Sequence, residues 1–166
     1  IATGVYDEGF ISYTGTSNAL TAMKGVAVRT YAGAPFTLDL TGTPYTGAKS
    51  INITKTTSPT TSADGWNLIG NPYPSAIDAE EFLAANTYHA TTNPTGVIYG
   101  NVKLWTHGYQ PAAIVNPFYG SFAYNYNAND YVTLNYLGAS DPIGASNIIK
   151  SGQAFFVQMV DGTTGT

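Results

Sequence analysis

The chain has 166 residues, of which only 10% are charged, and its formal net charge is -4 at pH 7. Its six Lys and Arg residues are scattered and cannot build the basic face that nucleic acid requires, which excludes a nucleic-acid partner. The sequence contains no cysteine, which excludes disulfides and thiolate metal sites, and no apolar run approaches the roughly 20 residues of a membrane helix, so we expect no membrane insertion.

Strands are predicted along most of the chain, because short segments of alternating apolar and polar residues are separated by turn residues. In the first half they are predicted at 5–6, 10–13, 24–31, 36–40 and 50–54. In the second half they are predicted at 65–69, 97–99, 102–105, 121–126, 131–136 and 154–160. The dipeptide Gly100-Asn101 suits a tight hairpin turn or a bulge between two of these strands.

The stretch 65–78 is predicted to organise the rest of the fold. It begins as a strand in which Trp66 and Leu68 point inward. The glycine and asparagine at 70–71 tolerate positive φ, and the two prolines that follow force extended backbone before them. We therefore predict a rigid structural corner, formed by Trp66, Gly70, Asn71, Pro72 and Pro74.

A single short helix is predicted near residues 76–85. Ser75 and Asp78 offer N-cap oxygens, and Glu80 and Glu81 suit the first helical turn. Together with the strands, this helix predicts an all-β domain, a two-sheet β-sandwich of jelly-roll type with one short α-helix. The predicted core consists of Phe36, Leu38, Trp66, Leu68, Phe82, Leu104, Phe155 and Val157.

No constellation of residues in the sequence predicts catalysis. His89 and His107 fall on separate predicted loops, without the spacing of a histidine metal site. The acids at 78–81 are explained by the start of the helix. The stretch 144–148 half-matches a nucleophile elbow but lacks its closing glycine. We therefore expect a protein that is not an enzyme.

A calcium site is the remaining metal candidate. Asn127, Asn129 and Asp130 offer oxygen ligands at alternate positions, which suits Ca²⁺. This stretch lacks the central glycine and the following glutamate of an EF-hand loop. A plain hairpin turn rich in Asn and Asp is the favoured interpretation, and we expect no cofactor.

Tyrosine stands out in the composition, with 13 residues in the chain. Its rigid, amphipathic side chain is favoured at protein interfaces and on surfaces where sugar rings stack. Ordinary cross-strand pairing of aromatic residues on a sheet is the competing interpretation. The candidate ligand or interface contacts are Trp105, Tyr109, Tyr119, Tyr124, Tyr126 and Tyr131, and a sugar site would add the amides of Asn125, Asn127 and Asn129.

A series of motifs gives the chain a resemblance to known proteins. The motifs are KGVAV at 24–28, LTGTPYTG at 40–47, SGQAFFV at 151–157 and, as the most specific, GWNLIGNPYPS at 65–75. Over about residues 20 to 160 the chain resembles a module that recurs in large secreted and surface proteins of Bacteroidota. There the module usually lies shortly before the sorting domain of the type IX secretion system. This chain departs from the usual pattern at Ala79, where an aromatic residue is common, and at Thr106, where an acid is common.

The resemblance implies export across the outer membrane and a place on the bacterial cell surface or in the extracellular matrix, and it supplies no catalytic residues. We expect residues 1–166 to form one domain of a longer or processed secreted polypeptide. The leading hypothesis is a structural or adhesive module that contacts other copies or other surface proteins and self-associates into an appendage or filament. The alternative is a carbohydrate-binding module whose partners are glycans.

Overall fold

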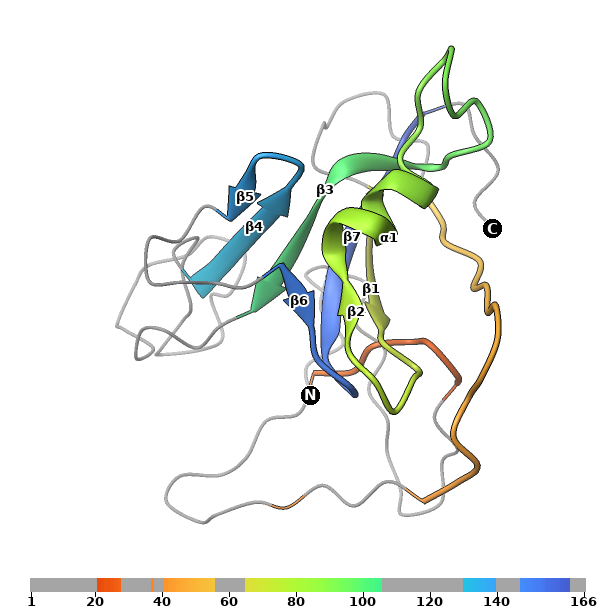
Figure 1. Cartoon of the computed structure of the whole chain (residues 1–166), viewed down its shortest axis with the longest axis vertical. Helices are drawn as coiled ribbons and strands as arrows, with labels where there is room; N and C mark the ends of the chain where they lie inside the picture. The colour runs from red at the N-terminus through yellow and green to blue at the C-terminus, as the bar shows by residue number, and fades with distance from the viewer. Residues whose placement is uncertain are drawn as a thin grey trace, which may run out of the picture.

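The computed structural model describes residues 21–27, 37, 41–55, 65–105, 130–139 and 147–161, and Figure 1 shows how they are arranged. Within these ranges the chain forms seven strands and one helix. The elements, in chain order, are β1 (Trp66–Gly70), β2 (Ile77–Asp78), α1 (Ala79–Asn86), β3 (Ile98–Trp105), β4 (Tyr131–Asn135), β5 (Gly138–Ala139), β6 (Ile148–Ile149) and β7 (Ala154–Met159).

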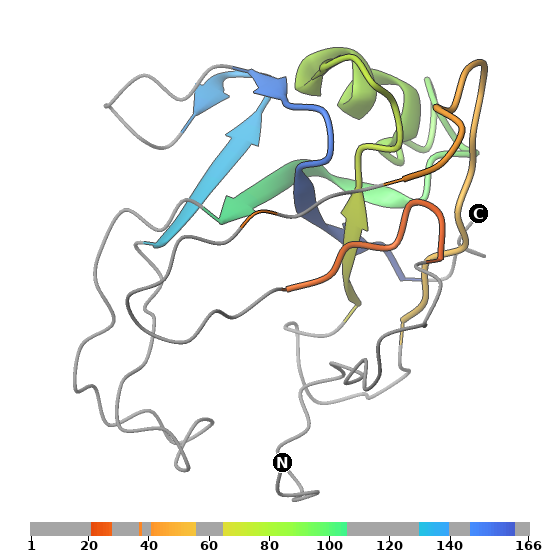
Figure 2. The same cartoon turned by 90° about the horizontal axis from the view of Figure 1, so that it is seen from below.

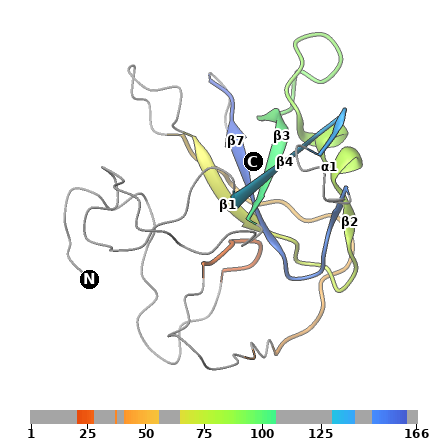
Figure 3. The ribbon, with the colours of Figure 1, turned by 90° about the vertical axis from the view of Figure 1, so that its left-hand side faces the viewer.

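Two antiparallel sheets make up the fold. The larger sheet has the strand order β1-β7-β3-β4-β5, and the smaller sheet pairs β2 with β6. Figures 2 and 3 show α1 lying on one side of the larger sheet, with β2 directly before it. The predicted fold class is confirmed, since the structure is mostly β, with two sheets and one short helix.

The core lies between α1 and one face of the larger sheet, which we call the inner face. Strand β7 alternates cleanly, so that Phe155, Val157 and Met159 are buried on this face. The ring of Phe82 on α1 meets the ring of Phe155 edge to face, with 5.2 Å between their centroids. The predicted core positions Leu104, Phe155 and Val157 are confirmed as buried, and Phe82 packs half-buried against them.

The helix begins at Ala79, three residues later than its predicted start, because Ile77 and Asp78 pair with β6 instead. Asp78 is the N-cap, and its Oδ1 accepts hydrogen bonds from the backbone N–H groups of Glu80 and Glu81, at 2.8 and 3.1 Å. No helix in the described ranges is long and apolar enough to cross a membrane.

In strand β1, the side chains that point to the inner face are not the ones that were predicted to do so. Its Ile69 is buried and lies opposite Phe155, whereas Leu68 lies opposite Phe156 on the outer face. Trp66 and Leu68 are therefore only half-buried, and their assignment to the core was wrong. The register to β7 decides this, because a shift of one residue exchanges the two faces of a strand.

Two predicted boundaries also change. The segments predicted at 97–99 and 102–105 belong to one continuous strand, β3, which begins at Ile98. Of the two alternatives for Gly100-Asn101, the hairpin turn is not formed, and the register against β7 shifts between Ile98 and Val102, as a bulge would require. The segment 50–54, which was predicted as a strand, joins neither sheet; its Ile53 is buried and its Ile51 is half-buried. Of the predicted strand 24–31, residues 24–27 are described, and Lys24 forms a single antiparallel bridge with Ile69.

Several predicted features lie outside the described residues. These are the strands at 5–6, 10–13 and 121–126, the core positions Phe36 and Leu38, and the turn residues Asn127 and Asn129.

Candidate functional site

Asn71 is the centre of the corner that follows β1. Its side chain is 5% exposed, and its Nδ2 donates hydrogen bonds to the carbonyl oxygens of Ser75, Ile149 and Lys150, at 2.9, 3.2 and 3.1 Å. Its Oδ1 accepts from the backbone N–H of Tyr73 at 3.0 Å. One buried amide therefore fixes the corner and joins it to β6, which belongs to a distant part of the sequence.

The corner owes its shape to these bonds rather than to positive φ. Gly70 and Asn71 were predicted to tolerate positive φ, but neither has it: in the described chain Met23 is the only non-glycine residue with positive φ, and Gly70 is not among the glycines that have it. Pro72 is half-buried and Pro74 is exposed beside Asn71, and both lie in the turn between β1 and β2.

Residues 47–54, which we call the strap, run past the edge of the sheet beside β1 and are held at both ends (Figure 1). At one end, the amide of Asn67 accepts from the N–H of Thr54 at 3.0 Å and donates to its carbonyl at 2.9 Å. At the other end, the hydroxyl of Tyr73 donates to the carbonyl of Gly47 at 2.9 Å. Asn67 and Tyr73 both belong to the stretch 65–75, so the same motif that turns the corner also positions the strap.

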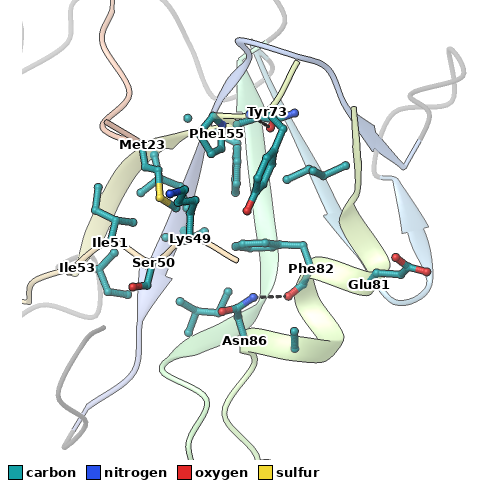
Figure 4. A pocket seen from close by; sticks show the side chains of 18 of the residues that line it. Met23, Lys49, Ser50, Ile51, Ile53, Tyr73, Glu81, Phe82, Asn86 and Phe155 are labelled. Carbon is teal, nitrogen blue, oxygen red and sulfur yellow. Dashed lines mark hydrogen bonds between the residues drawn. The ribbon is translucent and has the colours of Figure 1, made fainter. Parts of the chain in front are cut away.

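A groove lies between the strap and α1, with the inner face of the sheet as its floor (Figure 4). Its volume is about 470 Å³, which falls in the range of small-molecule sites. Ile51 and Ile53 line it from the strap, Phe82 from the helix and Phe155 from the sheet. Polar groups stand at the rim, where Lys49, Ser50, Tyr73, Glu81 and Asn86 are found. The groove is thus an apolar channel with a few polar groups around it.

Sequence reasoning missed this groove and the residues that form it. Asn67 is a polar residue between apolar neighbours in a strand, but the prediction that Trp66 and Leu68 face inward put it on the outer side. In the structure Asn67 lies on the inner side, opposite Val157. A polar side chain in such a position needs a hydrogen-bond partner, and here that partner is the backbone of Thr54. No feature of the sequence predicted that Lys49 would lie at the groove.

The predicted contact residues that are described lie on the outer face of the larger sheet. Trp105 and Tyr131 are direct cross-strand partners on β3 and β4, and both are half-buried. The ring of Tyr131 meets the ring of Phe156 edge-on, with 5.8 Å between centroids. On the same face, Nζ of Lys103 lies 4.5 Å from the ring centroid of Trp66. The other candidates lie outside the described residues: Tyr109, Tyr119, Tyr124 and Tyr126.

Two tyrosines that were not singled out are more exposed than these. Thr87 and Ile98 form a parallel bridge, so the residues that follow them, Tyr88 and Tyr99, fall on the same side. Their side chains are 42% and 41% exposed. The structure therefore offers two exposed tyrosines, Tyr99 on β3 and Tyr88 in the segment bridged to the start of that strand.

Metal-binding groups are sparse in the described chain. No group of three or more His, Cys, Asp or Glu side chains there could hold a metal ion. Asp130, from the calcium candidate, is buried at the start of β4, while its predicted co-ligands lie outside the described residues. His89 has a structural part, because its Nδ1 accepts from the N–H groups of Thr91 and Thr92 at 3.3 and 3.2 Å.

The comparison with protein families gives one match. A family described as a domain of unknown function, DUF8693, matches residues 3–166. The chain belongs to this family. The DUF8693 match spans the corner, the strap and both sheets. These parts are also joined to one another by hydrogen bonds. No curated protein and no solved structure matches the chain.

Proposed function

We propose that this chain is a non-catalytic structural or adhesive module of a bacterial cell surface, one that associates with other copies or with other surface proteins. The observation that carries the proposal is the use of polar groups in the stretch 65–78. The side-chain oxygens and nitrogens of Asn67, Asn71 and Asp78 form hydrogen bonds with the domain's own backbone. The most specific motif of the sequence therefore works as a scaffold.

A scaffold of this kind suits a protein whose task is contact rather than chemistry. A catalytic site needs titratable or nucleophilic groups that face an opening and are free to react. In the stretch 65–78 the acid caps a helix and the amides tie strands and strap together. The low content of charged residues also favours close association, since little like-charge repulsion opposes the packing of copies. The surface location rests on the resemblance of the motifs to exported proteins of Bacteroidota.

Association can be tested with the purified chain over a wide range of concentrations. Sedimentation velocity and light scattering would give the mass distribution, and negative-stain electron microscopy would show any filaments. We expect oligomers or fibrils that grow with concentration. A strictly monomeric protein at every concentration, which also fails to bind cells or extracellular matrix of the source bacterium, would contradict the proposal.

Glycan binding is the second candidate, and the exposed pair Tyr88 and Tyr99 favours it. Two exposed aromatic side chains on one side of the chain can stack against sugar rings. The test is a glycan array, followed by pull-down on insoluble polysaccharides. We expect the double variant Tyr88→Ala/Tyr99→Ala to lose binding, and the control Tyr45→Ala, which removes another exposed tyrosine, to keep it. Binding unchanged in the double variant would remove this pair from consideration.

A further inference from the structure

Within the part of the chain that the structure describes, the core is incompletely covered at the groove between the strap and α1. Four half-buried apolar side chains pack against the core: Ile51, Ile77, Phe82 and Val97. All four line the groove. The apolar surface that the fold leaves partly open is therefore gathered in one channel with a defined floor and two walls, which is the usual form of a ligand site.

The charges around the groove favour an anion. Lys49 stands on the strap side, where its ammonium lies 4.8 Å from the ring centroid of Tyr45. Within the described chain Lys49 takes part in no ion pair. The carboxylate of Asp78 is engaged by the helix N-terminus, and Figure 4 shows the carboxylate of Glu81 directed away from the groove. Among the described residues that line this apolar channel, Lys49 is the one with a cationic side chain.

We propose that this groove binds a small amphipathic carboxylate with a medium-length hydrocarbon chain. The hydrocarbon lies on Ile51, Ile53 and Phe82, and the carboxylate meets the ammonium of Lys49. An aliphatic body matches the apolar walls, and the groove volume of about 470 Å³ leaves room for it. The clamps at Asn67 and Tyr73 tie the strap to β1 and to the corner, so this wall of the groove is held in place by the domain's own hydrogen bonds. This inference is independent of the proposed surface role.

Three probes with the same hydrocarbon and different ends test the charge preference. They are octanoate, octanol and octylammonium, used below their micelle concentrations and measured by calorimetry at neutral pH and low salt. We expect octanoate to bind most tightly and octylammonium most weakly. In Lys49→Gln, octanoate should bind about fivefold more weakly while octanol is unchanged, because an exposed ion pair contributes only modestly. Lys150→Gln, which removes another exposed lysine outside the groove, should leave both affinities as they are.

Methyl NMR spectra locate the site independently of affinity. Octanoate should shift the methyl signals of Ile51 and Ile53, and leave that of Ile148, which is exposed on β6, in place. Equal affinities for octanoate and octylammonium, or an octanoate affinity unchanged in Lys49→Gln, would overturn the proposal. So would shifts confined to residues outside the groove, or no binding up to about 10 mM by a protein that its spectrum shows to be folded.

Discussion

The side-chain amide of Asn71 donates a hydrogen bond of 3.2 Å to the carbonyl oxygen of Ile149, a residue 78 positions further along the chain. The same nitrogen also reaches the carbonyls of Ser75 and Lys150. A buried amide is thereby shared between the corner after β1 and the end of β6, and removing it leaves several backbone groups without partners in a place that water reaches poorly.

Asn71→Ala should lower the free energy of unfolding by about 2–4 kcal/mol, because it removes four hydrogen bonds and leaves buried carbonyl groups without a hydrogen-bond donor. Urea denaturation measures the change through the midpoint of the transition. The matched control is Asn52→Ala, which alters an exposed asparagine and should stay within about 0.5 kcal/mol of the parent. Equal effects of the two substitutions would show that the corner does not depend on this amide.

Asn67→Ala should release one end of the strap. The N–H of Thr54 loses its acceptor, the Oδ1 of Asn67, so its amide hydrogen should exchange with solvent at least about tenfold faster. Hydrogen exchange followed by NMR gives this rate residue by residue. Tyr73→Phe removes the bond at the other end of the strap and should leave the exchange of Thr54 nearly unchanged. If Thr54 exchanges at the parental rate in Asn67→Ala, the clamp is not what protects it.

Gly96→Ala should destabilise the protein by about 2–3 kcal/mol or prevent folding, since a Cβ at this position would overlap the carbonyl group of Thr87 and lie 2.6 Å from the nitrogen of Tyr88. Backbone atoms cannot move aside as a flexible side chain can. Gly70→Ala is the matched control, because the nearest atom to its added Cβ is 3.9 Å away. Thermal unfolding compares the two, and similar melting temperatures would contradict the close approach at Gly96.

The adjacent residues Phe155 and Phe156 test the two faces of the larger sheet. Phe155 is 1% exposed and packs against Phe82, so Phe155→Ala should cost about 3–5 kcal/mol. Phe156 lies half-buried on the outer face, and Phe156→Ala should cost about half as much. Denaturant titration of both variants gives the ranking. A larger loss at Phe156 would mean that the principal core lies on the outer face.

The apolar run at 154–157 was enough to predict β7, and the predicted core residues Phe155 and Val157 are buried on its inner face. Strand β1 was harder, since Leu68 and Ile69 are both large and apolar and occupy opposite faces. Local pattern cannot choose between them. The choice comes from the register to β7, which places Ile69 opposite Phe155.

The groove illustrates the same limit at longer range. The segment 50–54 was predicted as a strand, but it stays outside both sheets. The reason is tertiary, because the side chain of Asn67 takes the backbone groups of Thr54 that a neighbouring strand would otherwise use. The local preference for a strand is overridden where a side chain distant in the sequence takes the backbone hydrogen bonds that a neighbouring strand would need.

The position of β7 has a consequence for how the chain acquires its structure. In the larger sheet β7 lies between β1 and β3, so these two earlier strands meet only through a strand that is synthesised after both. During synthesis, the helix and most of the core residues are therefore made before the strand that joins them. Long loops must close before the central pairings form, which predicts slow, late and strongly cooperative folding. Until β7 is available, β1 and β3 lack their common partner, and we expect the apolar side chains that pack on β7 to stay exposed to solvent.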